Sequence, residues 1–231
     1  MSRRIVVTGG FGALGRAVSR LAIARGWRTT LIDFQAEPPA GLAAGLGGEA
    51  HLQGGVDLAD AAAAVAALGE AADRHGGLDV LVNVAGGFAW RTLEDAGYAP
   101  WGELHRLNVA TAVNASAAAL PFLVASGSGR IVNVGANAAL KAAAGMGAYA
   151  GAKAAVHRLT ESLSEELKDR GVTVNAVLPS IIDTPANRAD MPDADFDRWV
   201  SPAALAEVIL FLASEEAGAV TGALLPVIGR V

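Results

Sequence analysis

Short apolar runs recur along the chain and are separated by longer stretches with helical spacing. Several of these runs are apolar throughout, as strands that are covered on both faces tend to be. They predict strands at 4–8, 28–33, 49–54, 80–84, 130–134, 173–178 and 223–227. The alanine-rich stretches between them predict helices at 14–25, 59–75, 101–125, 149–170 and 202–214.

This alternation of strand and helix predicts the α/β class, with one doubly wound parallel sheet of about seven strands and helices on both faces. No repeat or change of composition divides the chain, so we expect residues 1–231 to form a single domain. Residues 184–200 are dense in Pro, Asp and Asn and are expected to be irregular. Irregular segments of that length are uncommon unless they are functional or disordered.

Composition narrows the class of protein. Hydrophobic residues make up 52% of the 231 residues and charged residues 18%, which excludes a disordered chain. A net charge of −5 gives no reason to expect nucleic acid or a membrane as partner. The absence of cysteine excludes disulfides, thiolate catalysis and Cys-ligated metals. The first apolar run, Ile5-Val6-Val7, is too short for a signal peptide or a membrane span, so we expect a cytoplasmic location.

A glycine-rich segment follows the first predicted strand and opens the first predicted helix. Glycines at such a place allow a tight turn and let the backbone approach a pyrophosphate, whose charge the helix N-terminus stabilises. A purely structural turn is the alternative, but the strand–turn–helix context favours dinucleotide binding. The predicted contacts are Gly9, Phe11, Gly12, Ala13, Leu14 and Gly15.

Asp33 ends the second predicted strand, 18 residues beyond Gly15. A carboxylate there accepts hydrogen bonds from ribose hydroxyls and repels a 2′-phosphate. Neither the glycine-rich segment nor the following residue, Phe34, supplies an Arg or Lys to hold such a phosphate. An ordinary turn residue is the alternative for Asp33. The sequence therefore favours NAD(H) over NADP(H).

Tyr149 and Lys153 lie four residues apart on a predicted helix, and so share one face of it. A nearby cation lowers the pKa of a phenol from about 10 towards the working pH, where acid–base catalysis is most efficient. A half-buried Tyr and a solvated Lys are the alternative. The helix follows the fifth strand of a dinucleotide-binding sheet, where strand ends converge on bound ligand. We therefore predict a proton-transfer pair.

With these motifs, nearly the whole chain resembles the short-chain dehydrogenase/reductase family. Further segments resemble family elements in the expected order. They are Asp57-Leu58, similar to the adenine-contacting pair; Asn83-Val84-Ala85-Gly86, similar to the segment that shapes the cofactor crevice; Asn108, similar to the helix Asn that supports a water relay to the Lys; and 179–184, similar to the segment that holds the nicotinamide amide.

The resemblance implies a Rossmann-type fold and an NAD(P)-dependent oxidoreductase. It implies that Tyr149 exchanges a proton with substrate, and that Lys153 lowers the pKa of that phenol and binds the nicotinamide ribose. Asn108 is expected to hold the relay water, and 184–200 to close over the substrate. Cofactor contacts are also expected from Asp57, Leu58, Asn83, Ala85, Gly86, Pro179, Ile182 and Thr184. The resemblance also implies a homodimer or homotetramer, whose subunits would contact each other through the small-residue faces of 110–119 and 149–156.

One position departs from the family pattern. The family carries a Ser thirteen residues before its Tyr, which donates a hydrogen bond to the substrate oxygen, and here that position is Ala136. Loss of one such donor costs about 10²–10³ in rate. Three explanations are open: Asn137 replaces the donor, the substrate does not need it, or activity is lost.

Dihydropteridine reductases, within the same family, are similar in this stretch. The similarity extends to 9–15, to Val84-Ala85-Gly86-Gly87 followed by Phe88, to Gly145-Met146, and to the blocks 176–179, 183–188 and 191–196. A quinonoid dihydropterin is an electron-poor imine that needs less polarisation than a ketone. Phe88 or Trp90 could stack on a flat heterocycle, or pack in the core. Asn108, in contrast, fits the general dehydrogenase pattern better.

The sequence thus predicts an NAD(H)-dependent oxidoreductase, with a dihydropteridine reductase-like activity as the first hypothesis. A ketone or secondary-alcohol dehydrogenase in which Asn137 serves as donor is the second. A non-catalytic NAD-binding sensor or scaffold is the alternative from another class. The presence of both Tyr149 and Lys153 argues against it, because such a module does not need that pair.

Overall fold

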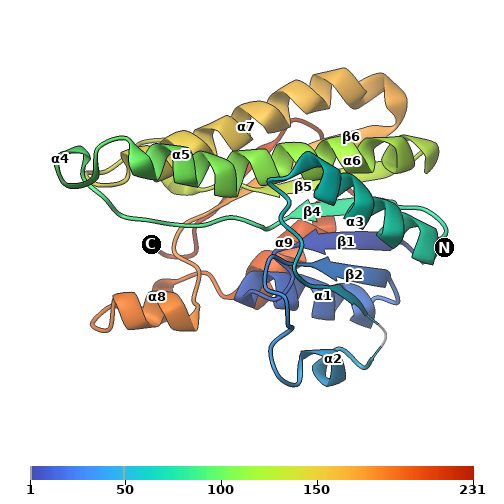
Figure 1. The fold of residues 1–231 in the computed structure, drawn as a ribbon, viewed down its shortest axis with the longest axis horizontal. Coiled ribbons are helices and arrows are strands. Elements are labelled where there is room, and N and C mark those ends of the chain that lie inside the picture. The colour runs from blue at the N-terminus through green and yellow to red at the C-terminus, as the bar shows by residue number, and fades with distance from the viewer. Residues whose placement is uncertain (1, 49) are drawn as a thin grey trace.

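In a computed structural model, which describes residues 2–48 and 50–231, seven strands form one parallel sheet (Figure 1). Their spatial order is β3-β2-β1-β4-β5-β6-β7, so the predicted doubly wound sheet is confirmed. The strands are β1 (Arg4–Thr8), β2 (Arg28–Ile32), β3 (His51–Gln53), β4 (Val80–Asn83), β5 (Gly129–Val134), β6 (Val172–Pro179) and β7 (Leu224–Val227). Glu49, predicted to begin the third strand, lies outside the described residues.

The five predicted helical stretches are found close to their predicted ranges, and three short helices, at 42–45, 93–96 and 185–190, were not predicted. The helices are α1 (Ala13–Ala24), α2 (Leu42–Gly45), α3 (Ala61–His75), α4 (Leu93–Ala96), α5 (Ala99–His105), α6 (Thr111–Ala125), α7 (Gly147–Leu167), α8 (Pro185–Asp190) and α9 (Pro202–Leu212). The helix predicted at 101–125 is interrupted, because a π-helical turn over Arg106–Ala110 joins α5 to α6. Such turns inside helices are frequent at functional sites.

Alternate residues of each strand enter two different cores, as the period of two requires. Ile5 and Val7 of β1 pack in a cluster with residues of α1 and α9, whereas Val6 packs in a cluster with residues of α3, α6 and α7. Figure 1 shows the two layers, with α3, α6 and α7 on one side of the sheet and α1 on the other. Burial on both faces explains why the strands are apolar throughout.

The stretch Ala99–Ala125 is long and apolar enough to cross a membrane by length and composition alone. In this fold it packs over the sheet, and α6 also lies against α3. Leu104, Ala115, Ala119 and Leu123 along it are almost fully buried. These contacts are those of a core helix.

Residues 184–200 are more ordered than predicted. They hold α8 and a 3₁₀ turn over Phe196–Arg198, and a parallel bridge joins Ile182 to Val200. The Thr184 side chain accepts a hydrogen bond from the Asn187 N–H, and Pro185 begins the helix. A Thr N-cap followed by Pro is a helix-start signal, which the dense Pro, Asp and Asn composition obscured.

Candidate active site

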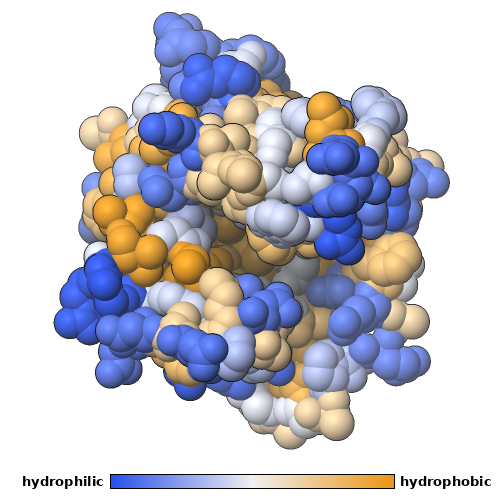
Figure 2. Space-filling view, turned by 90° about the vertical axis from the view of Figure 1, so that its left-hand side faces the viewer, coloured by the Kyte–Doolittle hydropathy of each residue, from blue (hydrophilic) through white to orange (hydrophobic). Residues whose placement is uncertain are grey.

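The carboxyl ends of the strands lie towards the left-hand side of Figure 1, and several predicted site residues, among them Asn83 and Pro179, end a strand there. Figure 2 looks onto this face, which is hollowed near its middle and carries hydrophobic side chains beside the hollow. Carboxyl ends of parallel strands are the usual ligand-binding edge of such sheets.

The glycine-rich segment forms a close-packed turn between β1 and α1. Gly9 has φ +61°, and a Cβ there would lie 2.8 Å from the Ala85 nitrogen. A Cβ on Gly15 would lie 2.2 Å from the Gly9 oxygen. In the described chain no side chain caps α1, whose N-cap is Gly12. The first-turn N–H groups are therefore available to an anion, and this cradle fits a dinucleotide pyrophosphate.

Asp33 follows β2 directly and lies against this turn. Its Oδ2 accepts a hydrogen bond from the Phe11 N–H at 2.9 Å, and its Oδ1 accepts one from the Gln35 N–H at 3.0 Å. Each carboxylate oxygen can accept a further bond. The structure thus holds the Asp33 carboxyl group beside the glycine-rich segment.

Asp57 has a partner that the sequence did not predict. Its carboxylate accepts from the Ala59 N–H at 2.9 Å and forms an ion pair with Arg106 of the π-helical turn, also at 2.9 Å. The Leu58 side chain lies in the core, and its carbonyl accepts from Asn114 Nδ2 at 3.0 Å. The N-cap of the following helix, α3, is Asp60.

Asn83 is buried at the end of β4 and belongs to a row of polar side chains. Its Nδ2 donates to Ser116 Oγ at 3.1 Å and to Asn133 Oδ1 at 2.9 Å, and Asn133 Nδ2 donates to Thr160 Oγ1 at 2.9 Å. This row ties β4 and β5 to α6 and α7. This row of hydrogen bonds therefore holds the strand ends that border the expected cofactor crevice in place.

Thr8, which we did not predict as a site residue, connects β1 to the segment after β4. Its Oγ1 accepts from the N–H groups of Val84 and Ala85, both at 3.1 Å. A hydroxyl at the end of the first strand is the signal that sequence analysis overlooked. Through it, Ala85 and Gly86 are held beside the glycine-rich segment.

Asn108 and Lys153 meet around Gly86. A Cβ on Gly86 would lie 2.5 Å from Asn108 Oδ1 and 3.4 Å from Lys153 Nζ. Asn108 sits on the π-helical turn, where Oδ1 accepts from the Gly87 N–H at 3.3 Å and Nδ2 donates to the Gly87 carbonyl at 3.0 Å. Lys153 Nζ donates to the Val134 carbonyl at 2.8 Å. Tyr149 lies one turn before Lys153 on α7.

The ionisation of Tyr149 differs from the expectation that its pKa is lowered. Burial raises the pKa of Tyr149 to about 12, and burial lowers the pKa of Lys153 to about 8. Desolvation is the cause of both shifts, and the Lys153 ammonium is directed at the Val134 carbonyl. In this state of the protein Tyr149 holds its proton firmly at neutral pH.

A buried histidine lies behind the position of Ala136. The Ala136 N–H donates to His157 Nε2 at 3.3 Å, and a Cβ on Gly135 would come within 2.5 Å of the same nitrogen. His157 is 2% exposed and lies one turn after Lys153 on the same face of α7. Asn137 begins a 3₁₀ turn over Asn137–Ala139 and is half-buried. We did not predict His157, although its spacing of four from Lys153 was visible.

Aromatic side chains form one wall of the site. The rings of Phe88 and Tyr149 meet edge to face with centroids 5.0 Å apart, and Phe88 is 57% exposed. Trp90 Nε1 donates to the Ala144 carbonyl at 3.0 Å. Gly145 has φ +74°, and a Cβ there would lie 2.3 Å from the Trp90 ring. The segment after β4 is thereby fastened to the residues that precede α7.

The segment 179–184 completes the edge at the end of β6. Pro179 is buried, and Ser180 Oγ donates to the Ile228 carbonyl at 2.8 Å. Ile182 is bridged to Val200, and Thr184 caps α8. Within residues 2–48 and 50–231, no group of three or more His, Cys, Asp or Glu residues could hold a metal ion.

Comparison with protein families decides the class. A family model described as short chain dehydrogenase matches residues 3–195. The chain belongs to this family. It is therefore an oxidoreductase of the NAD(P)-binding short-chain type.

Curated relatives are dehydrogenases and reductases of similar length. The chain is 33% identical to 2-(S)-hydroxypropyl-CoM dehydrogenase 3 of Xanthobacter autotrophicus, covering 97% of this chain and 94% of the relative. It is 32% identical to the 2,5-dichloro-2,5-cyclohexadiene-1,4-diol dehydrogenase LinX of Sphingobium indicum, with 97% and 94% covered. It is also 32% identical to the 3-oxoacyl-[acyl-carrier-protein] reductase FabG of Vibrio harveyi, with 97% and 95% covered.

Solved structures share the fold closely. A short-chain type dehydrogenase/reductase from Mycobacterium ulcerans superposes with a TM-score of 0.93 at 25% identity, over 100% of this chain and 90% of that one. Similar folds are found in an NAD⁺-bound xylitol dehydrogenase (TM-score 0.89, 22% identity, 98% of each chain) and in ElxO with NADP bound (0.91, 23%, 99% and 98%). Because these two proteins hold different dinucleotides, the likeness of fold leaves the choice of cofactor open.

Proposed function

We propose that this protein is an NAD(H)-dependent oxidoreductase in which Tyr149 exchanges a proton with the substrate. The observation that supports it is that Tyr149, Lys153 and Asn108 contact the segment after β4 at Gly86 and Phe88. Ala85 of the same segment lies against Gly9 of the glycine-rich turn, which Asp33 also contacts. When bound in that cradle, the dinucleotide supplies or accepts the hydride. The chain's own residues supply the proton and the orientation.

Each polar group has a defined task in this proposal. Tyr149 donates its phenolic proton to the substrate oxygen or nitrogen that gains negative charge as the substrate is reduced. A phenolate left in a buried place is unfavourable, since burial raises the pKa of Tyr149 to about 12. Lys153 offsets this cost by its charge and holds the cofactor ribose. Asn108 keeps the Gly87 backbone in position and supports the water that resupplies the proton.

The cofactor preference that we propose rests on Asp33. Its carboxylate is held beside the glycine-rich segment by the Phe11 and Gln35 N–H groups, where it would face a 2′-phosphate. Isothermal titration should give tighter binding for NADH than for NADPH. Asp33→Ala should reduce this difference in affinity between the two cofactors. Glu37→Gln, which removes an exposed neighbouring charge, is the matched control and should leave the difference unchanged. Equal or tighter binding of NADPH to the parent would refute the preference.

For the acceptor, we propose an electron-poor conjugated imine or quinonoid ring, as in dihydropteridine reductases. Ala136 is buried and offers only its methyl group where a hydroxyl would polarise a carbonyl. The exposed Phe88 ring beside Tyr149 supplies a flat apolar wall for a planar heterocycle. An acceptor that is already activated needs no further donor.

A ketone or secondary-alcohol substrate is the second candidate. The three relatives are described as acting on a hydroxypropyl, a cyclohexadiene-diol or a 3-oxoacyl compound. The Asn137 side chain is half-buried at the same strand end and makes no hydrogen bond with the described part of the chain, so its amide is available as a donor. In this alternative, Asn137 replaces the missing hydroxyl.

Two substitutions separate the candidates when kcat/KM is measured on a quinonoid dihydropterin and on a ketone such as an acetoacetyl ester. For the activated acceptor, Ala136→Ser should change pterin turnover little and improve ketone turnover by up to about 10²–10³, while Asn137→Ala is nearly silent. For the ketone enzyme, Asn137→Ala should greatly lower kcat/KM on the ketone, and adding Ala136→Ser to that variant should partly restore it. A parent that binds NADH but reduces neither compound would indicate a non-catalytic module.

We also propose a homodimer or homotetramer that packs through the small-residue faces at 110–119 and 149–156, and a cytoplasmic location. Light scattering on the purified protein tests the assembly. A monomer at micromolar concentration would contradict it.

A further inference from the structure

A second pocket lies at the opposite edge of the sheet, where β5 and β6 begin. Its volume is about 290 Å³, and its lining contains both polar and apolar groups. Two cationic side chains line it, Arg130 and Lys168, together with three hydroxyl side chains, Ser128, Thr173 and Thr221. The other lining residues are glycines and one valine, so no acid lines it among the residues that the structure describes.

Arg130 is 6% exposed and has donors to spare. Its Nε donates to the Ser214 carbonyl at 3.1 Å and its Nη1 to the Gly129 carbonyl at 2.8 Å. A guanidinium carries five N–H groups, so three remain after these two bonds. Nη2 has no protein acceptor within residues 2–48 and 50–231, and a Cβ on Gly218, in the pocket lining, would lie 3.5 Å from it. The guanidinium thus has free donors at the pocket.

Thr173 supplies an independent sign of a missing partner. It is 9% exposed, and its Oγ1 is buried without a hydrogen bond in the described structure. The register of the sheet pairs Thr173 of β6 with Arg130 of β5, so both side chains leave the sheet on the same face. Buried hydroxyls are almost always satisfied, which points to a ligand or water between these strands.

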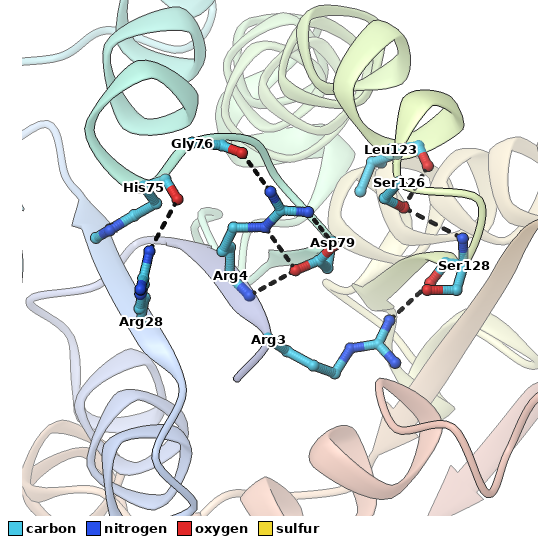
Figure 3. A network of polar contacts seen from close by, with 9 residues as sticks. All are labelled: Arg3, Arg4, Arg28, His75, Gly76, Asp79, Leu123, Ser126 and Ser128. Atoms are coloured by element: carbon cyan, nitrogen blue, oxygen red, sulfur yellow. Dashed lines mark hydrogen bonds and ion pairs between the residues drawn. The ribbon is translucent and has the colours of Figure 1, made fainter. Parts of the chain in front are cut away.

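Cationic side chains line or flank the pocket, and the acids near them lie outside its lining. Arg3, which is 7% exposed, donates from Nη2 to the Ser128 carbonyl at 2.6 Å and so brings a third cation beside the pocket (Figure 3). Asp79, the acid in that view, is engaged by Arg4. Glu165 pairs with Lys168, Glu215 and Glu216 lie close to Arg3, and Glu215 also lies close to Arg130. None of these acids lines the pocket.

We propose that this pocket binds a small oxyanion, with phosphate or a phosphate monoester as the chemical class. Arg130 would provide a charged donor, Thr173 and Ser128 hydroxyl donors, and Lys168 an exposed charge at the entrance. The site is distinct from the dinucleotide cradle, which lies at the carboxyl edge of the sheet. Because Arg130 also joins β5 to the carbonyl of Ser214 just after α9, a bound anion would tighten this edge of the fold.

The test is titration of the full-length protein with sodium phosphate at constant ionic strength, followed by calorimetry and thermal denaturation. Thr173→Val keeps the shape and removes only a hydroxyl that lacks a partner, so the variant should fold at least as well as the parent. We expect it to weaken phosphate binding about tenfold or more. Sodium chloride at matched ionic strength should not reproduce the stabilisation of the parent.

Two neighbouring cationic residues allow a second comparison that does not depend on Thr173. Lys168 and Arg170 share the 3₁₀ turn Lys168–Arg170, and both are exposed, but only Lys168 lines the pocket. Lys168→Ala should weaken phosphate binding several-fold, and Arg170→Ala should not. Equal phosphate binding in the parent, Thr173→Val and Lys168→Ala would place the anion elsewhere, for example on the glycine-rich segment. That result, or no binding beyond the chloride control, would overturn the proposal.

Discussion

His157 offers the sharpest test of how the site is supported, because its contact is internal and specific. Together, Lys153 and His157 anchor the backbone after β5 at two points, through the Val134 carbonyl and the Ala136 N–H. His157→Leu replaces the imidazole with an apolar side chain of similar bulk and so removes the hydrogen-bond acceptor. The Ala136 N–H is then left buried and unpaired. The substitution should therefore disturb both stability and the wall of the site.

The size of the effect follows from the loss of a partner by a buried N–H group. Such a loss costs about 1–3 kcal/mol. For a chain of this length each kcal/mol lowers Tm by about 2–4 °C. We expect a clear drop in Tm by calorimetry, and a fall in kcat of substrate turnover that exceeds any change in NADH affinity. His157→Gln, which can still accept a hydrogen bond, is the control and should restore most of both.

The pH dependence gives an independent readout. Burial, with the nearby charges of Arg158 and Lys153, lowers the pKa of His157 below 6.5, so the neutral ring accepts the hydrogen bond. This stabilisation is complete above pH 6.5 and is lost as the pH falls through the lowered pKa. The stability difference between parent and His157→Leu should shrink over that range. A variant with parental Tm, turnover and pH profile would refute the supporting role of His157.

Three further predictions concern the framework of the site. Gly145→Ala places a side chain at φ +74° and against Trp90, so the free energy of unfolding should fall by more than the roughly 1–2 kcal/mol of left-handed strain, and KM should rise. A melting curve like that of the parent would contradict this. Thr8→Val removes the acceptor for two N–H groups beside the cradle, so NADH affinity in titration calorimetry should fall, whereas Thr221→Val at the other edge should not lower it. Burial raises the pKa of Asp79, but hydrogen bonds from Arg4 outweigh it and leave that pKa lowered; in urea denaturation Asp79→Asn should therefore be destabilised at neutral pH and approach the parent as the pH falls through that pKa. A difference in unfolding free energy between the parent and Asp79→Asn that does not change with pH would contradict the last prediction.

Features with a local cause could be predicted from the sequence. The strands are apolar throughout because both faces are buried, so their positions and the sheet could be predicted within a residue or two. The glycine-rich segment and Asp33 could also be predicted, because each follows a strand directly and the carboxyl ends share one edge. Structure places Asp33 against the Phe11 N–H in agreement with this. The family belongs among these successes, since several spaced motifs carry it.

Features that depend on distant partners could not be predicted. The ion pair of Asp57 with Arg106 joins residues 49 positions apart. The raised pKa of Tyr149 results from burial by the surrounding fold, whereas the sequence showed only a cation four residues away. The helix α8 was missed because a composition rich in Pro and Asp was given more weight than the Thr–Pro start signal.

The most direct test of the proposed mechanism is the turnover of Tyr149→Phe with a substrate that the parent reduces. The variant keeps the ring that packs on Phe88 and loses only the hydroxyl. We predict that NADH binding, measured by titration calorimetry, stays within about twofold of the parent while kcat falls by about 10² or more. Turnover at the parental rate with an intact fold would show that Tyr149 is not the proton donor and would contradict the account.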